Sequence, residues 1–166
     1  QPHPAQMNLL QQVVKIGHAA PLSGPMSHWG KDNDNGIRLA MEELNAQKLV
    51  IGGKPVQFEL KSEDDQGDPK QAVVVANQLV DFGVQGMLGH FNSGAAIPAA
   101  PIYNKQSIPN LSPATNPGFT ELGYNNVFRV LASDADVGAA LAELAVNKLG
   151  AKRFAIVDDR TAYGKG

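Results

Sequence analysis

Small and hydroxyl-bearing side chains follow two apolar runs of this sequence, and they could bind a small charged solute. Ser93 lies in residues 89–98, GHFNSGAAIP, directly after one such run. Its hydroxyl, with the free N–H groups and dipole of a helix beginning there, would suit a carboxylate. Ala114 and Thr115 lie in a second loop, SPATNP. Structural interpretations remain open, since Ser93 could be only a helix N-cap and Thr115 only the cap of a short helix.

The single tryptophan, Trp29, stands in the segment PMSHWG after the first apolar run. An indole at that place could form the apolar wall of a ligand site. It could equally be a half-buried packing residue. What Trp29 shares with Ser93, Ala114 and Thr115 is its position after a predicted strand, so all four are expected at one edge of a sheet.

Other motifs that could hold a metal or a nucleotide are weak. The acids of residues 64–68, DDQGD, precede a proline and are typical of a helix entry, where acids favour the positive end of the dipole. Residues 32–35, DNDN, are followed by Gly36 and Ile37, where a calcium loop needs a fifth-position ligand and then a glycine. The four histidines have no zinc-ligand spacing and no evident serine or cysteine partner, and no glycine-rich phosphate loop follows the first strand. We expect no metal and no cofactor.

Strand-like and helix-like segments alternate along the chain. Asp68 and Pro69 provide a helix cap and a first helical residue. The alternation predicts an α/β fold, a parallel sheet with helices on both faces, whose ligands bind beyond the carboxyl ends of the strands. The predicted strands are 13–19, 56–62, 84–88, 109–112, 127–131 and 153–158, and the predicted helices are 32–45, 69–82, a helix through 105, and 134–149.

Composition excludes several partners. The chain has 166 residues, 43% hydrophobic and 18% charged, with a net charge of -2 and no basic run, so nucleic acid and anionic lipid are not expected partners. There is no cysteine. No apolar segment reaches the roughly 18 residues of a membrane span. The first residues lack the features of a signal peptide, so an exported protein would have lost its signal already.

Four segments together resemble the leucine/isoleucine/valine-binding proteins of bacterial ABC transporters, over the chain from about Lys15 onward. They are GPMSHWG, DDQGDPKQAVVVANQLV, GHFNSGAAIPAAPIY and NLSPATNPGFT. The resemblance implies the two-lobe periplasmic binding protein fold, with parallel sheets flanked by helices and one amino acid bound between the lobes. It also implies a protein that is not an enzyme.

The resemblance assigns roles to five residues. Ser93 and Thr115 would bind the α-carboxylate of the amino acid, and the Ala114 carbonyl and Thr115 hydroxyl its α-ammonium. Trp29 corresponds to a cleft-lining tyrosine, and Tyr163, in DDRTAYGKG, to a second-lobe tyrosine that closes over the ligand.

The sequence departs from the family pattern at three places. The loop SPATNP is one residue shorter than the commonest family loop. A family cysteine pair is represented by Gln66 and Asn92, so no disulfide can brace the first lobe. Tryptophan in place of tyrosine at position 29 changes the pocket volume and therefore the side-chain preference.

The domain organisation follows from the resemblance. Residues 13–129 are expected to form the first lobe, incomplete without strands contributed from further along the family chain, and residues 130–166 to begin the second. The predicted strand 153–158 and its loop end where a covering helix should start, so we expect this chain to be the N-terminal part of a longer protein.

The sequence therefore predicts a periplasmic solute-binding component of an ABC importer for a branched-chain or related aliphatic amino acid, working with a permease in the inner membrane and not itself inserting into the bilayer. One alternative is a binding or sensor protein of the same fold for another small solute, such as an amide, urea or an aromatic acid. A second is a hydrolase or nucleotide-dependent enzyme on a doubly wound sheet.

Overall fold

One six-stranded sheet forms the centre of the protein in the computed structural model, which describes residues 11–166. The strand order is β2-β3-β1-β4-β5-β6, and every neighbouring pair is parallel except the antiparallel β2 and β3. The predicted α/β class is confirmed, with one short antiparallel edge strand that the sequence did not indicate. The strands are β1 (Gln12–Ala20), β2 (Val50–Ile51), β3 (Lys54–Asp64), β4 (Gly86–Gly89), β5 (Asn110–Ser112) and β6 (Val127–Arg129).

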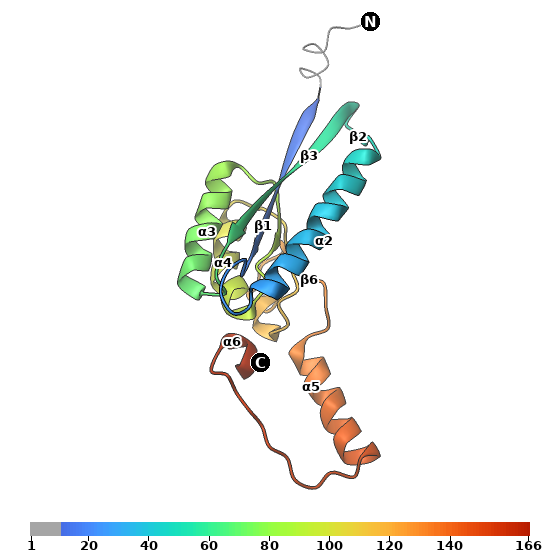
Figure 1. The fold of residues 1–166 in the computed structure, drawn as a ribbon, viewed down its shortest axis with the longest axis vertical. Helices are drawn as coiled ribbons and strands as arrows, with labels where there is room; N and C mark the ends of the chain where they lie inside the picture. The colour runs from blue at the N-terminus through green and yellow to red at the C-terminus, as the bar shows by residue number, and fades with distance from the viewer. Residues whose placement is uncertain (1–10) are drawn as a thin grey trace, which may run out of the picture.

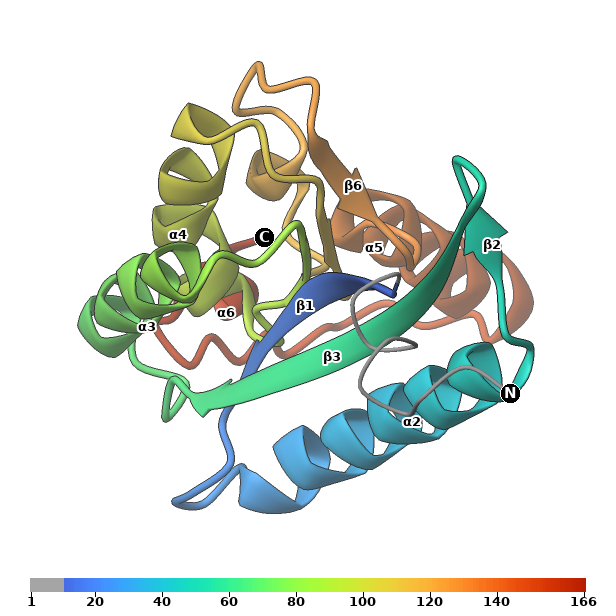
Figure 2. The same cartoon turned by 90° about the horizontal axis from the view of Figure 1, so that it is seen from above.

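Helices cover both faces of this sheet, as predicted (Figures 1 and 2). One face carries α2 (Ser27–Ala46), and the other carries α3 (Pro69–Phe82) and α4 (Ser93–Lys105). The 3-10 helix η1 (Pro117–Phe119) follows β5. After β6 the chain continues through α5 (Asp134–Glu143), the π-helical turn η2 (Leu144–Lys148) and the short α6 (Ala162–Lys165).

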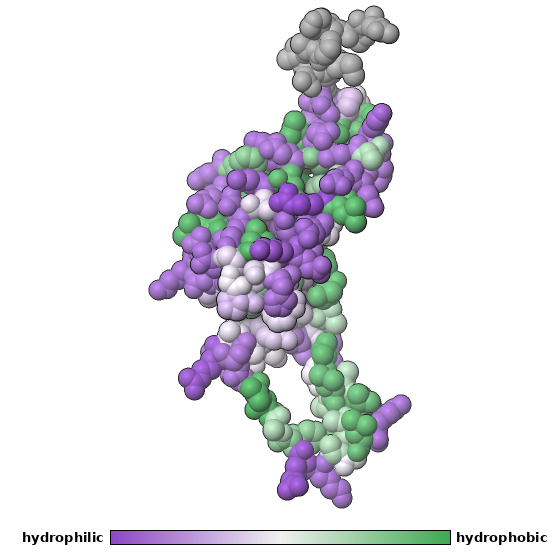
Figure 3. All heavy atoms as spheres, viewed as in Figure 1, coloured by the Kyte–Doolittle hydropathy of each residue, from purple (hydrophilic) through white to green (hydrophobic). Residues whose placement is uncertain are grey.

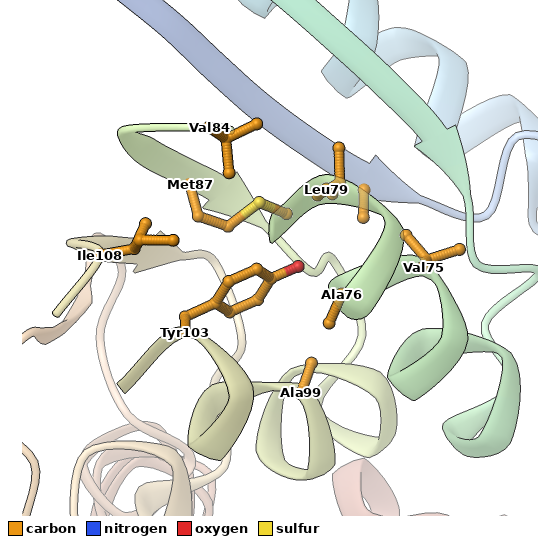
Figure 4. Close-up of a cluster of buried hydrophobic side chains, with 9 residues drawn as sticks. Val75, Ala76, Leu79, Val84, Met87, Ala99, Tyr103 and Ile108 are labelled. Atoms are coloured by element: carbon orange, nitrogen blue, oxygen red, sulfur yellow. The ribbon is translucent and has the colours of Figure 1, made fainter. Parts of the chain in front are cut away.

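The main core lies between the sheet and the pair α3 and α4 (Figure 4). Leu79 of α3 and Tyr103 of α4 are fully buried there, beside Met87 of β4. A second cluster packs the other side of α4 against Phe119 of η1 and Val127 of β6. Both clusters fix α4, so the start of this helix has a firm position at the end of the sheet.

Local sequence signals explain the element boundaries well in the middle of the chain. The Asp68 carboxylate accepts hydrogen bonds from the backbone N–H groups of Lys70 and Gln71, and Pro69 is the first residue of α3. The predicted cap is therefore confirmed.

Gly89 ends β4 with a φ of 129°, and a Cβ there would come within 2.5 Å of the Ala19 carbonyl oxygen. Only glycine allows β1 and β4 to approach so closely at their ends.

Two predicted elements differ from the structure. The first helix begins at Ser27 and not at residue 32, because the N–H groups of Trp29 and Gly30 already bond to the Met26 carbonyl. A Cβ at Gly30 would collide with the carbonyl oxygen of Pro21, so glycine is needed where the helix meets the preceding loop. Trp29 thus lies in a helix, whereas the sequence placed it in a loop.

The predicted strand 153–158 is wrong, since this segment makes no strand pairing in the described chain. A strand needs a neighbour for its backbone groups, and the sheet ends at β6. Ile156 and Val157 are each 93% exposed, and apolar side chains gather over α5 and this following segment (Figure 3). The helix predicted at 134–149 is present as α5 and η2, with its last turn widened.

Candidate functional site at the carboxyl ends of the strands

A cleft of about 720 Å³ opens beyond the carboxyl ends of the strands. Four of the five residues singled out in the sequence line it, namely Trp29, Ser93, Thr115 and Tyr163. The fifth, Ala114, is buried beside Thr115 without lining the cleft. The remaining lining residues are Met26, Gly67, Pro69, Phe91, Asn92, Gly94, Pro113, Leu131, Asp159, Arg160, Thr161 and Ala162.

Ser93 stands at the first turn of α4 and is only 2% exposed. The N-cap of this helix is Asn92, so the interpretation of Ser93 as the cap is wrong. The Ser93 hydroxyl instead accepts a hydrogen bond of 3.2 Å from the backbone N–H of Asn116. It therefore links the start of α4 to the loop that carries Thr115. A hydroxyl beside the first N–H groups of a helix is a suitable environment for an anion.

Thr115 lies in the loop between β5 and η1. It was one candidate for the cap of the following short helix, but η1 is capped by the next residue, Asn116. The Asn116 side chain accepts from the N–H of Gly118 at 2.8 Å and caps η1. The Thr115 carbonyl accepts from the N–H of Asp134, which connects this loop to the start of α5. Thr115 therefore lines the cleft without capping η1.

Aromatic side chains approach the cleft from two separate elements. Trp29, in the first turn of α2, is 54% exposed, and its ring centroid lies 4.5 Å from that of His28 with the two ring planes tilted by 43°. Tyr163, in α6, is 57% exposed. The Asn116 side chain donates a hydrogen bond of 2.5 Å to the Ala162 carbonyl, which holds α6 against the loop after β5. Large apolar surfaces left open to solvent beside polar anchors are typical of a binding site.

Sequence reasoning missed several residues of this cleft. Met26, Phe91 and Leu131 add apolar surface, and Asp159 and Arg160 add one charge of each sign. Hydrogen bonds from Thr161 lower the pKa of the Asp159 carboxyl below its usual value, so this side chain is a carboxylate at neutral pH. Phe91 could have been found, because it follows a predicted strand in the same loop as Ser93.

The acids of residues 64–68 each stabilise a turn. Asp64 accepts from the Leu22 and Gln66 N–H groups and from the Ser23 hydroxyl. Asp68 caps α3, as the sequence indicated. In residues 11–166 no group of three or more histidine, cysteine or acidic side chains could hold a metal ion.

Asp65, His90 and Tyr103 form a fully buried chain of side-chain hydrogen bonds, which we call the relay. Nδ1 of His90 lies 2.7 Å from a carboxylate oxygen of Asp65, and Nε2 lies 3.0 Å from the Tyr103 hydroxyl. The order acid, histidine, hydroxyl is that of a nucleophilic triad. Here, however, burial raises the pKa of the Tyr103 phenol above its usual value, and the side chain has no solvent access. A solute in the cleft cannot reach this hydroxyl, so the arrangement supports structure and not catalysis.

Gly67, the residue after Gln66, lies beside Asn92. A Cβ built on Gly67 would lie 3.5 Å from Oδ1 of Asn92. The Asn92 amide contacts the sulfur of Met26 at 3.4 Å. The loops after β3 and β4 therefore meet here without a covalent link.

Comparison with known proteins defines the class. Residues 13–166 match the family model described as periplasmic binding protein, and the chain belongs to that family. Its relatives include the leucine-specific-binding protein of Salmonella typhimurium, 38% identical over 154 residues, which cover 92% of this chain and 41% of that protein. The Leu/Ile/Val-binding protein of Escherichia coli K12 is 34% identical over 158 residues, 95% of this chain and 42% of the other. The chain spans about two fifths of the length of these relatives.

A solved structure agrees with both the fold and the class. The leucine binding protein of Thermotoga maritima superposes with a TM-score of 0.82 at 30% identity, covering 92% of this chain and 43% of that one. The resemblance to leucine and branched-chain amino-acid binding proteins is thereby confirmed. These relatives are binding proteins and not enzymes. Within residues 11–166, no helix is long and apolar enough to cross a membrane.

Proposed function

We propose that this chain is part of a periplasmic solute-binding protein of an ABC importer, and that its cleft binds a branched-chain or related aliphatic amino acid. The observation that carries the proposal is the convergence of two buried or half-buried hydroxyls, Ser93 and Thr115, with two exposed aromatic side chains, Trp29 and Tyr163, on one cleft. The hydroxyls suit the charged head of an amino acid, and the aromatic surfaces suit its side chain.

The polar end of the ligand would bind at the start of α4. Ser93 and Thr115 would donate to the α-carboxylate, with the dipole of α4 adding to their effect. The Ala114 carbonyl and the Thr115 hydroxyl would accept from the α-ammonium. Ala114 needs no exposed side chain for this role, since only its carbonyl is used.

The apolar end would lie against Trp29, Leu131 and Tyr163. Full burial of a leucine-sized side chain stabilises a complex by roughly 1.5–3 kcal/mol, which corresponds to one to two decades in affinity. We propose that residues 13–129 form the first lobe and residues 130–166 begin the second, so that closing the lobes brings Tyr163 over the ligand. The relatives' names support the ligand class.

Location and partner follow from the same proposal. A periplasmic binding protein delivers its solute to a permease in the inner membrane, and we propose this role here without a resident cofactor or metal. The family match and the relatives support it.

A ligand screen tests the proposed function on the protein at its natural length. Thermal shift and calorimetry would compare leucine, isoleucine and valine with benzoate, acetamide and urea, because a ligand stabilises only a protein that binds it. We expect saturable stabilisation by at least one aliphatic amino acid and no turnover of the bound compound. Binding of an aromatic acid or an amide, with no binding of any aliphatic amino acid, would favour the alternative of another small solute.

A further inference from the structure

One buried hydroxyl connects the loop just before Ser93 to the loop that carries Thr115. Ser112, the last residue of β5, is fully buried and donates a hydrogen bond of 2.6 Å to the His90 carbonyl. The same oxygen accepts from the N–H of Ala114 at 3.0 Å. One end of this bridge is therefore in residues 90–92, the β4–α4 loop, and the other in residues 113–116, the β5–η1 loop.

The His90 carbonyl, which accepts from Ser112, has a fixed position because both ring nitrogens of His90 make hydrogen bonds. With Nδ1–H donating to Asp65, Nε2 accepts from the Tyr103 hydroxyl, and no polar atom of the ring is left over. The second oxygen of Asp65 accepts from the N–H of Gly67 at 2.9 Å. All three side chains of this relay are fully buried. The ring is thus held from the loop after β3 on one side and from α4 on the other.

Two further hydrogen bonds flank this bridge. The Asn110 amide, two residues before Ser112 in β5, donates to the carbonyl of Gly89, the last residue of β4, at 2.5 Å. Beyond it, the N–H of Asn116 donates to the Ser93 hydroxyl at 3.2 Å. Ser112 lies between these two contacts along the chain. The separation of Ser93 from Thr115 therefore depends on a chain of buried hydrogen bonds and not on packing alone.

We propose that Ser112, His90 and Asp65 are positioning residues that set the distance between the Ser93 and Thr115 anchors and so determine affinity for the amino acid. None of the three lines the cleft. Their effect on the ligand passes entirely through the β4–α4 and β5–η1 loops. This inference rests on the proposed function, since it concerns the anchors of the same site.

The test compares Ser112→Ala with Ser62→Ala in the protein at its natural length. Ser62 is a matched control, because its hydroxyl also makes a side-chain hydrogen bond at the sheet, to Asp34, on the α2 side of the molecule. Calorimetry with leucine, at a temperature where both variants are folded, measures affinity. We expect Ser112→Ala to weaken leucine binding about tenfold, whereas Ser62→Ala stays within about twofold of the parent.

A second measurement does not depend on any ligand. Hydrogen exchange at the backbone N–H of Asn116, whose acceptor Ser93 is untouched by the substitution, reports whether the loops have separated. We expect this amide to exchange faster in Ser112→Ala and unchanged in Ser62→Ala. Tyr103→Phe removes only the hydroxyl that holds His90, and it should raise the same exchange rate and weaken leucine binding about threefold. It replaces Ser112→Ala if that variant does not fold.

The outcomes separate the two proposals. If Ser112→Ala and Tyr103→Phe bind leucine like the parent and leave exchange at Asn116 unchanged, the positioning role is overturned. If the parent binds no aliphatic amino acid, the proposed function fails, and exchange at Asn116 still decides whether Ser112 positions the loops.

Discussion

Thr115→Val is the sharpest single test of the cleft, because it removes a hydroxyl while keeping the shape and β-branching of the side chain. The following 3-10 helix is capped by Asn116, so the substitution removes no cap. The backbone hydrogen bond from Asp134 to the Thr115 carbonyl does not involve the side chain. We therefore expect the free energy of unfolding to change by less than about 0.5 kcal/mol.

The effect on binding should be much larger. A hydrogen bond to a charged group contributes about 1.5–3 kcal/mol, and the variant would leave part of the ligand's charged head unpaired. Each 1.4 kcal/mol is a factor of ten in affinity, so leucine binding should weaken by about tenfold to a hundredfold. Calorimetry on the protein at its natural length measures this, and chemical unfolding measures stability in parallel.

Ser93→Ala provides the comparison for this experiment. Its hydroxyl accepts from the Asn116 N–H inside the protein, so Ser93→Ala should lower both stability and affinity. Thr115→Val should lower affinity alone. A Thr115→Val protein that binds leucine as tightly as the parent would refute the placement of this residue at the ligand. A loss of stability as large as the loss of binding would show that Thr115 is structural.

Three further predictions follow from other features. Trp29 is the only tryptophan of this chain and lines the cleft, so its fluorescence should shift saturably on titration with an aliphatic amino acid; a constant emission during calorimetrically proven binding would contradict its position. Burial lowers the pKa of His18 below its usual 6.5, so His18 is neutral when folded and takes up a proton more readily when unfolded. The contribution of His18 to the free energy of unfolding is constant above pH 6.5 and decreases as the pH falls below 6.5, by at most about 1.4 kcal/mol per pH unit. We expect His18→Asn to flatten this pH dependence, measured by urea unfolding at and below pH 6.5. Residues 1–166 expressed alone should self-associate through the apolar surface around Ile156 and Val157, and light scattering that shows a monodisperse monomer would disprove this.

Local patterns were sufficient to predict most of the sheet and its helices. The Asp68–Pro69 pair predicted the start of α3 because a cap and a first-turn proline act within a few residues. The start of α2 was missed because Met26 provides no side-chain cap, and the helix begins where Gly30 can pass the Pro21 carbonyl. That contact is tertiary and has no local signal.

The site was predictable in its positions and less so in its interactions. A shared sheet edge was enough to bring Trp29, Ser93 and Thr115 to one cleft. The relay of Asp65 with His90 joins residues 25 positions apart, so no spacing rule could have identified it. Asn116 could have been identified as the cap of η1, because it directly precedes Pro117, a favoured first residue of a helix.

The hairpin between β2 and β3 lies at the end of the sheet opposite the cleft (Figure 1), which makes it a convenient place for protein engineering. A Cβ at Gly52 or Gly53 would meet no atom of residues 11–166 within 4 Å, so an added side chain at this turn has room among the described residues. Because the sequence contains no cysteine, Lys54→Cys would give this part of the protein a single reactive thiol. A dye or a surface linker attached there would label or immobilise the molecule at the end of the sheet opposite the cleft, so that the cleft stays open to solutes.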